Sequence, residues 1–185
     1  MAYKPDWSGS NKNWALEGQN IFYGKEWSQK MTGKKAPAII DTGSSIIGVP
    51  HDAYAFLKEK WNTDISGLDC ITDDNFCQVM TPCSELYSKL KPIGIQMSDY
   101  VFEMKPELYL HQAEGKKCQF AIQENGMKGS SGDLYVVGDI LLRHLYQIYD
   151  FEDETISLGV NKHSLGEIRM FKAHGREPGE YYGTD

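Results

Sequence analysis

One short polar segment between two apolar runs constrains this chain more than any other feature. Residues 38–40, Ala-Ile-Ile, are small or β-branched and favour a buried strand. The turn-forming residues 41–45, Asp-Thr-Gly-Ser-Ser, follow at once, and Ile46 and Ile47 resume the apolar run. An unpaired carboxylate beside a protein interior is costly unless it is hydrogen-bonded or belongs to a functional site. Asp41 is therefore the first candidate for a functional residue.

Length and charge exclude several classes of protein. The chain has 185 residues, enough for one domain, and a chain of this size buries roughly 70% of the surface of its unfolded form. The net charge is −7 with acidic and basic residues interspersed, which argues against nucleic acid as a partner. We also expect no membrane span, because no apolar run approaches the roughly 18 residues required, and no targeting signal, because residues 1–10 are polar.

The four cysteines, Cys70, Cys77, Cys83 and Cys118, admit three interpretations. They are separated by six, five and thirty-four residues, whereas zinc sites favour closely paired cysteines or nearby histidines, and no histidine lies between Cys70 and Cys83. Two disulfides are favoured over zinc, and free buried thiols stay open as the third interpretation. The five histidines show no metal-ligand spacing either, and we expect them at solvated or hydrogen-bonded surface positions. We therefore expect no metal and no other cofactor.

The first two thirds of the chain are mostly β in character. Residues 14–23 read as a strand that ends in a turn at Gly24. Pro50 is placed to begin a helix over residues 51–61, where apolar residues recur at helical spacing, and a loop is expected over 62–74. The remaining predictions are a hairpin of residues 93–97 and 100–102 with Ser98 and Asp99 as its turn, and a strand over 117–122.

The last third adds a buried strand, a short helix and a hairpin. The strand covers residues 135–139 and breaks at a glycine, the helix covers 140–144, and the hairpin joins 146–149 to 156–160 through an acidic turn. The domain organisation expected is a polar segment over residues 1–13, one folded lobe over 14–160, and an extension over 161–185. The extension loses apolar periodicity, so we expect it to be partly disordered or to wrap another surface.

The order and spacing of these motifs resemble the carboxy-terminal lobe of a pepsin-like aspartic protease over about residues 14–160. The likeness rests on residues 41–45 after an apolar strand, on Pro50 and its helix, and on Val-Val-Gly at 136–138 followed by Asp-Ile-Leu-Leu-Arg at 139–143. The resemblance implies a mostly β fold, a single lobe with two short helices. It also implies a disulfide between Cys83 and Cys118, with Cys70 and Cys77 closing an extra small loop.

The resemblance also assigns roles within the loop. Asp41 would be the catalytic carboxylate, and Thr42 would contact its counterpart in another lobe. Gly43 would let its amide approach the carboxylate, and Ser44 would hydrogen-bond the outer carboxylate oxygen. The residues that the resemblance implies as support for the catalytic loop are Thr42, Gly43, Ser44, Ser45, Val136, Val137 and Gly138.

Aspartic proteolysis needs two carboxylates that share a proton, and this sequence contains a single Asp-Thr-Gly and no Asp-Ser-Gly. Asp41 would thus be half of a site. The resemblance implies an endopeptidase acting on peptide or protein substrates when an amino-terminal lobe, or a second protein chain, supplies the other aspartate.

Two alternatives stay open beside that interpretation. One is a homodimer that pairs two copies of Asp41 about a twofold axis. The other is a catalytically inactive lobe that serves as a structural or binding subunit of a larger assembly. The cysteines and the family likeness favour the secretory pathway, meaning a vacuolar, lysosomal or extracellular location.

Overall fold

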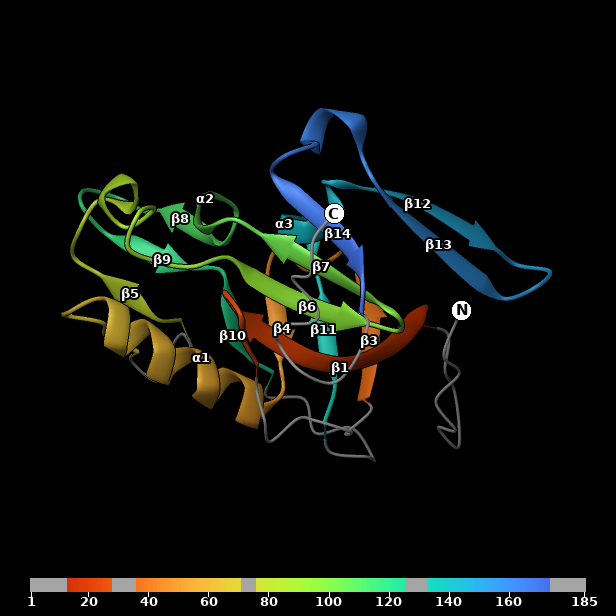
Figure 1. The fold of residues 1–185 in the computed structure, drawn as a ribbon, viewed down its shortest axis with the longest axis horizontal. Helices are drawn as coiled ribbons and strands as arrows, with labels where there is room; N and C mark the ends of the chain where they lie inside the picture. The colour runs from red at the N-terminus through yellow and green to blue at the C-terminus, as the bar shows by residue number, and fades with distance from the viewer. Residues whose placement is uncertain (1–12, 28–35, 71–75, 126–132, 174–185) are drawn as a thin grey trace.

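A computed structural model describes residues 13–27, 36–70, 76–125 and 133–173 of the chain. These residues form mostly strands (Figure 1). The strands are β1 (Ala15–Tyr23), β2 (Glu26–Trp27), β3 (Ala36–Ile40), β4 (Ile47–Val49), β5 (Gln78–Val79), β6 (Ile93–Met97), β7 (Tyr100–Met104), β8 (Leu110–Gln112), β9 (Cys118–Phe120), β10 (Ile122–Glu124), β11 (Tyr135–Val137), β12 (Leu145–Asp150), β13 (Thr155–Val160) and β14 (Ile168–Lys172). The helices are α1 (His51–Asp64), α2 (Pro106–Tyr109) and α3 (Asp139–Leu142), with single 3₁₀ turns η2 (Cys83–Glu85) and η3 (Lys162–Ser164).

One large sheet organises the fold. Its strands follow the order β10-β4-β11-β3-β1-β6-β7-β14, and β2 pairs with β1 beside this path. Strand β11 lies between β3 and β4, parallel to the first and antiparallel to the second. Two smaller sheets, β5-β9-β8 and β12-β13, complete the strand pairing of the described residues.

Most of the elements predicted from local patterns are present. Helix α1 begins directly after Pro50, and the two predicted hairpins are β6-β7 and β12-β13. The structure differs in three details. Helix α1 continues to Asp64, so the predicted loop begins at Ile65. The predicted strand over 117–122 is split between β9 and β10, which belong to different sheets, and α2 is a helix that the sequence patterns did not indicate.

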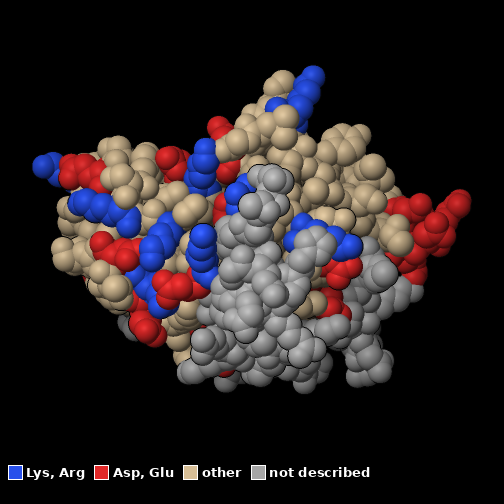
Figure 2. All heavy atoms as spheres, viewed as in Figure 1, with Lys and Arg blue, Asp and Glu red and all other residues tan. Residues whose placement is uncertain are grey.

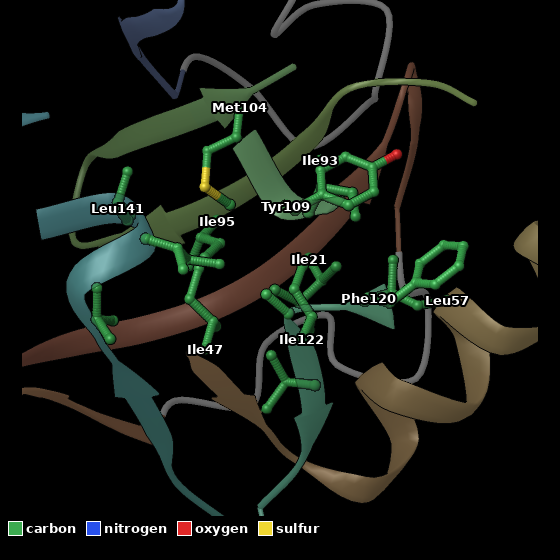
Figure 3. Close-up of a cluster of buried hydrophobic side chains, with 14 of the residues drawn as sticks. Ile21, Ile47, Leu57, Ile93, Ile95, Met104, Tyr109, Phe120, Ile122 and Leu141 are labelled. Atoms are coloured by element: carbon green, nitrogen blue, oxygen red, sulfur yellow. The ribbon is translucent and has the colours of Figure 1, made fainter. Parts of the chain in front are cut away.

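The hydrophobic core lies where the large sheet meets α1, α2, α3 and β9 (Figure 3). Helix α1 buries Ala53, Tyr54, Leu57 and Trp61, whose spacing places them on one face of the helix. The Trp61 ring lies 4.5 Å from the ring of Phe120, centroid to centroid. The apolar stripe read from the sequence is therefore the face that attaches α1 to the core.

Buried hydroxyls tie the helix to the sheet. The hydroxyl of Tyr23 in β1 donates to Asp64 at the end of α1 (2.8 Å) and accepts from the Lys91 N–H (3.1 Å). Burial is the main cause that raises the pKa of Tyr23, so this hydroxyl stays neutral and able to donate. The Tyr109 hydroxyl donates to the Lys91 carbonyl (2.8 Å), so α2 is also attached to the Lys91 backbone.

The segment after Val160 is partly regular, which its lack of periodicity did not predict. It contains η3 and β14, and β14 pairs antiparallel with β7 over five residues. Ile168, the first residue of β14, is 3% exposed and lies opposite Met104. The predicted extension thus contributes the last strand of the large sheet.

The β12-β13 hairpin extends from one end of the molecule (Figure 1). Leu145 and Ile156 on its inner face are buried, whereas Tyr146 and Ile148 on its outer face are exposed. Because side chains alternate along a strand, the two strands present one face to the core and one face to solvent.

Candidate active site

Asp41 lies at the end of β3, at the start of the loop that leads to β4. Its backbone N–H donates to the carbonyl of Val137 in β11 (3.0 Å), and its own carbonyl accepts from the Ser44 N–H (3.2 Å). The Asp41 side chain is half-buried, and the next two residues, Thr42 and Gly43, are exposed. The loop therefore holds the Asp41 backbone in place and leaves its tip open.

The carboxylate is oriented by the loop itself. The Gly43 N–H donates to Asp41 Oδ1 (2.9 Å), and a Cβ at position 43 would lie 3.1 Å from that oxygen. A glycine thus lets the amide approach the carboxylate, as the resemblance implied. Among the described residues, the donor to the Asp41 carboxylate is this Gly43 N–H.

Ser44 does not take the partner expected from the resemblance. Its hydroxyl donates to the Ile46 carbonyl (3.1 Å) and accepts from the Ile46 N–H (3.4 Å), so it stabilises the turn into β4. Among the described residues no hydrogen bond joins Ser44 Oγ to Asp41. The neighbouring Ser45 is exposed. The Ser44 hydroxyl is therefore occupied by the backbone of the turn into β4.

Residues 136–138 support the loop from the side of the core. Val136 and Val137 in β11 pair with Ile39 and Ile40 in β3. At Gly138, a Cβ would lie 2.1 Å from the carbonyl oxygen of Ile46 and 2.5 Å from that of Ser44. The next amide, Asp139 N–H, donates to the Ser44 carbonyl (2.7 Å). The structure thus brings together every residue that the sequence placed in the loop and its support.

Trp14, which precedes β1, is a further neighbour of the loop. Its carbonyl accepts from the N–H of Ile40, the residue before Asp41 (2.9 Å). Its ring makes edge-to-face contacts with Tyr149 (5.3 Å between centroids) and Phe151 (5.1 Å). Trp14 therefore connects the end of β3 to the β12-β13 hairpin.

A cleft of about 580 Å³ begins beside Ser45 and Ile46 and continues between α2, β9 and α3. Its apolar lining includes Phe120 and Ile140. Sequence patterns did not indicate that its polar residues meet, because they come from separate elements, although Asp139 and Arg143 belong to the segment 139–143 on which the resemblance rests. The polar residues are Glu107, His111, Gln119, Asp139, Arg143 and His144.

His144 is the most enclosed of the cleft's titratable groups, with its side chain 13% exposed. Its Nδ1 lies 2.8 Å from Ser164 Oγ in η3 and 3.7 Å from the Glu167 carboxylate. Burial, followed by the nearby Arg143 charge, lowers the pKa of His144 below its ordinary value. At neutral pH this histidine is therefore neutral and hydrogen-bonds the segment that follows β13.

The cysteines form two disulfides, Cys70–Cys77 and Cys83–Cys118. The second joins η2 to β9, 35 positions apart in the sequence. The disulfide interpretation is thus confirmed over zinc and over free thiols for all four. In the described ranges, no group of three or more His, Cys, Asp or Glu side chains is arranged to hold a metal ion.

The chain belongs to the eukaryotic aspartyl protease family, whose sequence profile matches residues 6–161. It is 27% identical to vacuolar protease A of Neurospora crassa over 155 aligned residues, and this alignment covers 80% of this chain and 34% of the relative. It is 28% identical over 149 residues to the vacuolar aspartic protease of Candida albicans (80% of this chain, 32% of the relative). It is 26% identical over 121 residues to pepsin A of Bos taurus (65% of this chain, 30% of the relative).

The chain spans about a third of the length of these relatives. Its fold, mostly β with short helices, agrees with a pepsin-like lobe. None of the helices in the described ranges has the length and apolar character needed to span a membrane.

Proposed function

We propose that this chain forms the carboxy-terminal half of an aspartic endopeptidase active site, in which Asp41 is one of two catalytic carboxylates. The observation that carries the proposal is the Asp41 loop. It fixes a half-exposed carboxylate through the Gly43 amide, and it is fixed in turn by Val137 and the tightly packed Gly138.

Two such carboxylates cleave peptides without a covalent intermediate on the enzyme. Like charges a few ångström apart cannot both ionise, so the pair shares one proton. The ionised member takes a proton from a water molecule as that water attacks the scissile carbonyl, and the protonated member donates to the carbonyl oxygen. The roles belong to the pair, and a single Asp41 cannot fill both.

The second carboxylate comes from outside this sequence, which contains one Asp-Thr-Gly and no Asp-Ser-Gly. Relatives named as proteases are about three times as long as the segment they share with this chain. We therefore assign the second aspartate to an amino-terminal lobe, facing the exposed Thr42 and Gly43. The cleft lined by Ser45 and Ile46 we assign to a side chain of the peptide substrate.

The test uses the complete protein that the gene encodes and a mixed peptide library at about pH 4 to 5, where such carboxyl pairs titrate. The wild type should cleave peptides, and Asp41→Asn should lower kcat/KM by roughly a thousandfold or more. Asp99→Asn, at an exposed turn between β6 and β7, is the matched control and should stay within about twofold of wild type.

Two results would contradict the proposal. Full activity in Asp41→Asn would exclude Asp41 as a catalytic group. A complete gene product with no second Asp-Thr-Gly or Asp-Ser-Gly segment, and no cleavage at acid pH, would favour an inactive lobe.

The alternative function is that of a catalytically inactive lobe that binds another protein. The exposed apolar face of the β12-β13 hairpin favours it, because such a face suits association and needs no second carboxylate. A stable complex that forms equally well with Asp41→Ala, in a protein that does not cleave peptides, would support this alternative over the first.

We also propose that the protein resides in the secretory pathway or a vacuole. The two disulfides support an oxidising compartment, and two of the relatives carry the word vacuolar in their names. Immunolocalisation of the complete protein tests this assignment.

A further inference from the structure

The cleft that begins beside the Asp41 loop combines an apolar interior with polar side chains. Leu110, Phe120 and Ile140 are buried and line it, and the half-buried Phe76 adds a second aromatic ring. Its volume of about 580 Å³ lies within the roughly 300 to 1,000 Å³ of typical ligand sites. The cleft is therefore large enough for a bulky side chain of the substrate together with part of its backbone.

Three polar side chains of the cleft have no partner among the described residues. Glu107 belongs to α2, His111 to β8 and Gln119 to β9, and within that part of the chain none of these side chains takes part in a hydrogen bond or an ion pair. His111 and Gln119 lie directly opposite each other in the register of β8 and β9, so their side chains leave the sheet on the same side. We call Glu107, His111 and Gln119 the polar rim.

The remaining polar groups of the cleft already have partners. Arg143 Nε lies 3.7 Å from Asp139 Oδ2, and the two residues are four positions apart on and after α3. His144 Nδ1 lies 2.8 Å from Ser164 Oγ. The groups that are still available to a bound peptide are therefore those of the polar rim.

Charge in the cleft includes both signs. Two carboxylates, one guanidinium and two imidazoles line it, from Glu107, Asp139, Arg143, His111 and His144. Figure 2 shows basic and acidic side chains interspersed over the end of the molecule where Figure 1 places α1, β5 and β9. A charged side chain of the substrate thus meets no field of a single sign at this end.

We propose that the cleft selects a tyrosine side chain of the peptide substrate, and that the polar rim determines this specificity. The inference rests on the proposed entry of a substrate side chain into this cleft. The tyrosine ring buries apolar area against Phe120 and Ile140. Its hydroxyl both donates and accepts, so it can bind a carboxylate, an amide or an imidazole in either protonation state.

Phenylalanine fills the same space without the hydroxyl. A phenylalanine ring in the cleft expels water from the polar rim and leaves these groups without a partner, which costs free energy for each group that is buried. A site that hydrogen-bonds a substrate hydroxyl discriminates strongly against the analogue that lacks it, whereas a purely apolar pocket does not. Tyrosine compared with phenylalanine is therefore the critical pair of substrates.

The test measures binding separately from catalysis. The complete protein that the gene encodes, carrying Asp41→Asn, is titrated by calorimetry with short peptides in which tyrosine or phenylalanine occupies each position in turn. At one position, tyrosine should raise the affinity at least about tenfold over phenylalanine. Adding Glu107→Leu and Gln119→Leu together should bring the two affinities within about twofold, because both acceptors of the hydroxyl are lost. Glu85→Leu with Gln78→Leu is the matched control, since neither residue lines the cleft.

Two results would overturn the proposal. Equal affinities for tyrosine and phenylalanine at every position would exclude a site that recognises the hydroxyl, and a tyrosine preference that survives in Glu107→Leu/Gln119→Leu would place that site elsewhere. Thermal unfolding of each variant shows that its fold is kept. A wild type that binds the tyrosine peptide and cleaves nothing would contradict the proposed catalysis alone, whereas cleavage without a tyrosine preference would contradict the role of the cleft alone.

Discussion

Gly138 shows how the absence of one side chain shapes the loop that carries Asp41. A Cβ at this position would overlap the carbonyl oxygens of Ile46 and Ser44, so the chain can pass here only as glycine. The sequence predicted that a buried strand breaks at this glycine. It could not show the cause, because the atoms that Gly138 meets belong to residues more than ninety positions earlier.

We expect Gly138→Ala to lower the free energy of unfolding by about 3 kcal/mol or more, since two backbone carbonyls would have to move. Gly159→Ala is the matched control, because a Cβ there meets no atom within 4 Å. Its effect should stay within about 1 kcal/mol and tend towards stabilisation. Urea unfolding of both variants makes the comparison, and equal losses in the two would contradict the packing argument.

Of the hydrogen bonds expected within the loop, that of Gly43 is present and that of Ser44 is not. Gly43 meets the carboxylate as expected, because a contact two residues away follows from the local turn. Ser44 does not, because its hydroxyl can reach either the Asp41 side chain or the Ile46 backbone, and sequence alone does not decide between two partners at similar spacing.

At the scale of elements, His144 joins the turn after α3 to η3 through Ser164. Burial and Arg143 lower the pKa of His144 in the folded chain below its ordinary value of 6.5. The unfolded chain therefore takes up this proton first, and stability is lost as the pH falls from about 6.5 through the lower folded pKa.

We expect His144→Gln to reduce the fall in Tm between about pH 7.5 and pH 5, since the variant has no proton to gain in that range. His111→Gln is the control, because His111 is exposed, and its slope should match the wild type. Differential scanning calorimetry across this range gives the result. A steeper slope in His144→Gln would contradict the assigned direction of the shift.

Strand β14 was missed for a reason that lies in its sequence. Of its five residues only Ile168 is buried, so no alternation of apolar and polar residues marks it as a strand. Its pairing with β7 joins segments more than sixty residues apart. By contrast, α1 and the two hairpins were predicted because their patterns are local.

We expect Ile168→Ala to lower the free energy of unfolding by about 2 kcal/mol or more, because it removes a buried side chain from the end of the sheet. Met170→Ala, two residues later and 37% exposed, should cost less than about 1 kcal/mol. Guanidinium unfolding measures both. No loss in Ile168→Ala would show that β14 adds nothing to the stability of the lobe.

At the scale of the whole molecule, the fold class followed from the sequence because a chain of short apolar strands with turn residues between them has few other ways to bury its core. The order of the strands did not follow. Strand β11 inserts between β3 and β4, and this position depends on contacts between distant segments. The cleft likewise depends on such contacts, because its side chains come from several elements.

The position of β11 has a consequence for the order of events on the ribosome. Val136 and Val137 pair with Ile39 and Ile40, 97 residues earlier, and Asp41 is hydrogen-bonded to Val137. Asp41 therefore leaves the exit tunnel long before its supporting strand does, and the nascent chain carries this loop unfinished while the 96 residues up to Val137 are added. A product released before residue 137 would contain the Asp-Thr-Gly triplet and lack the means to set its geometry.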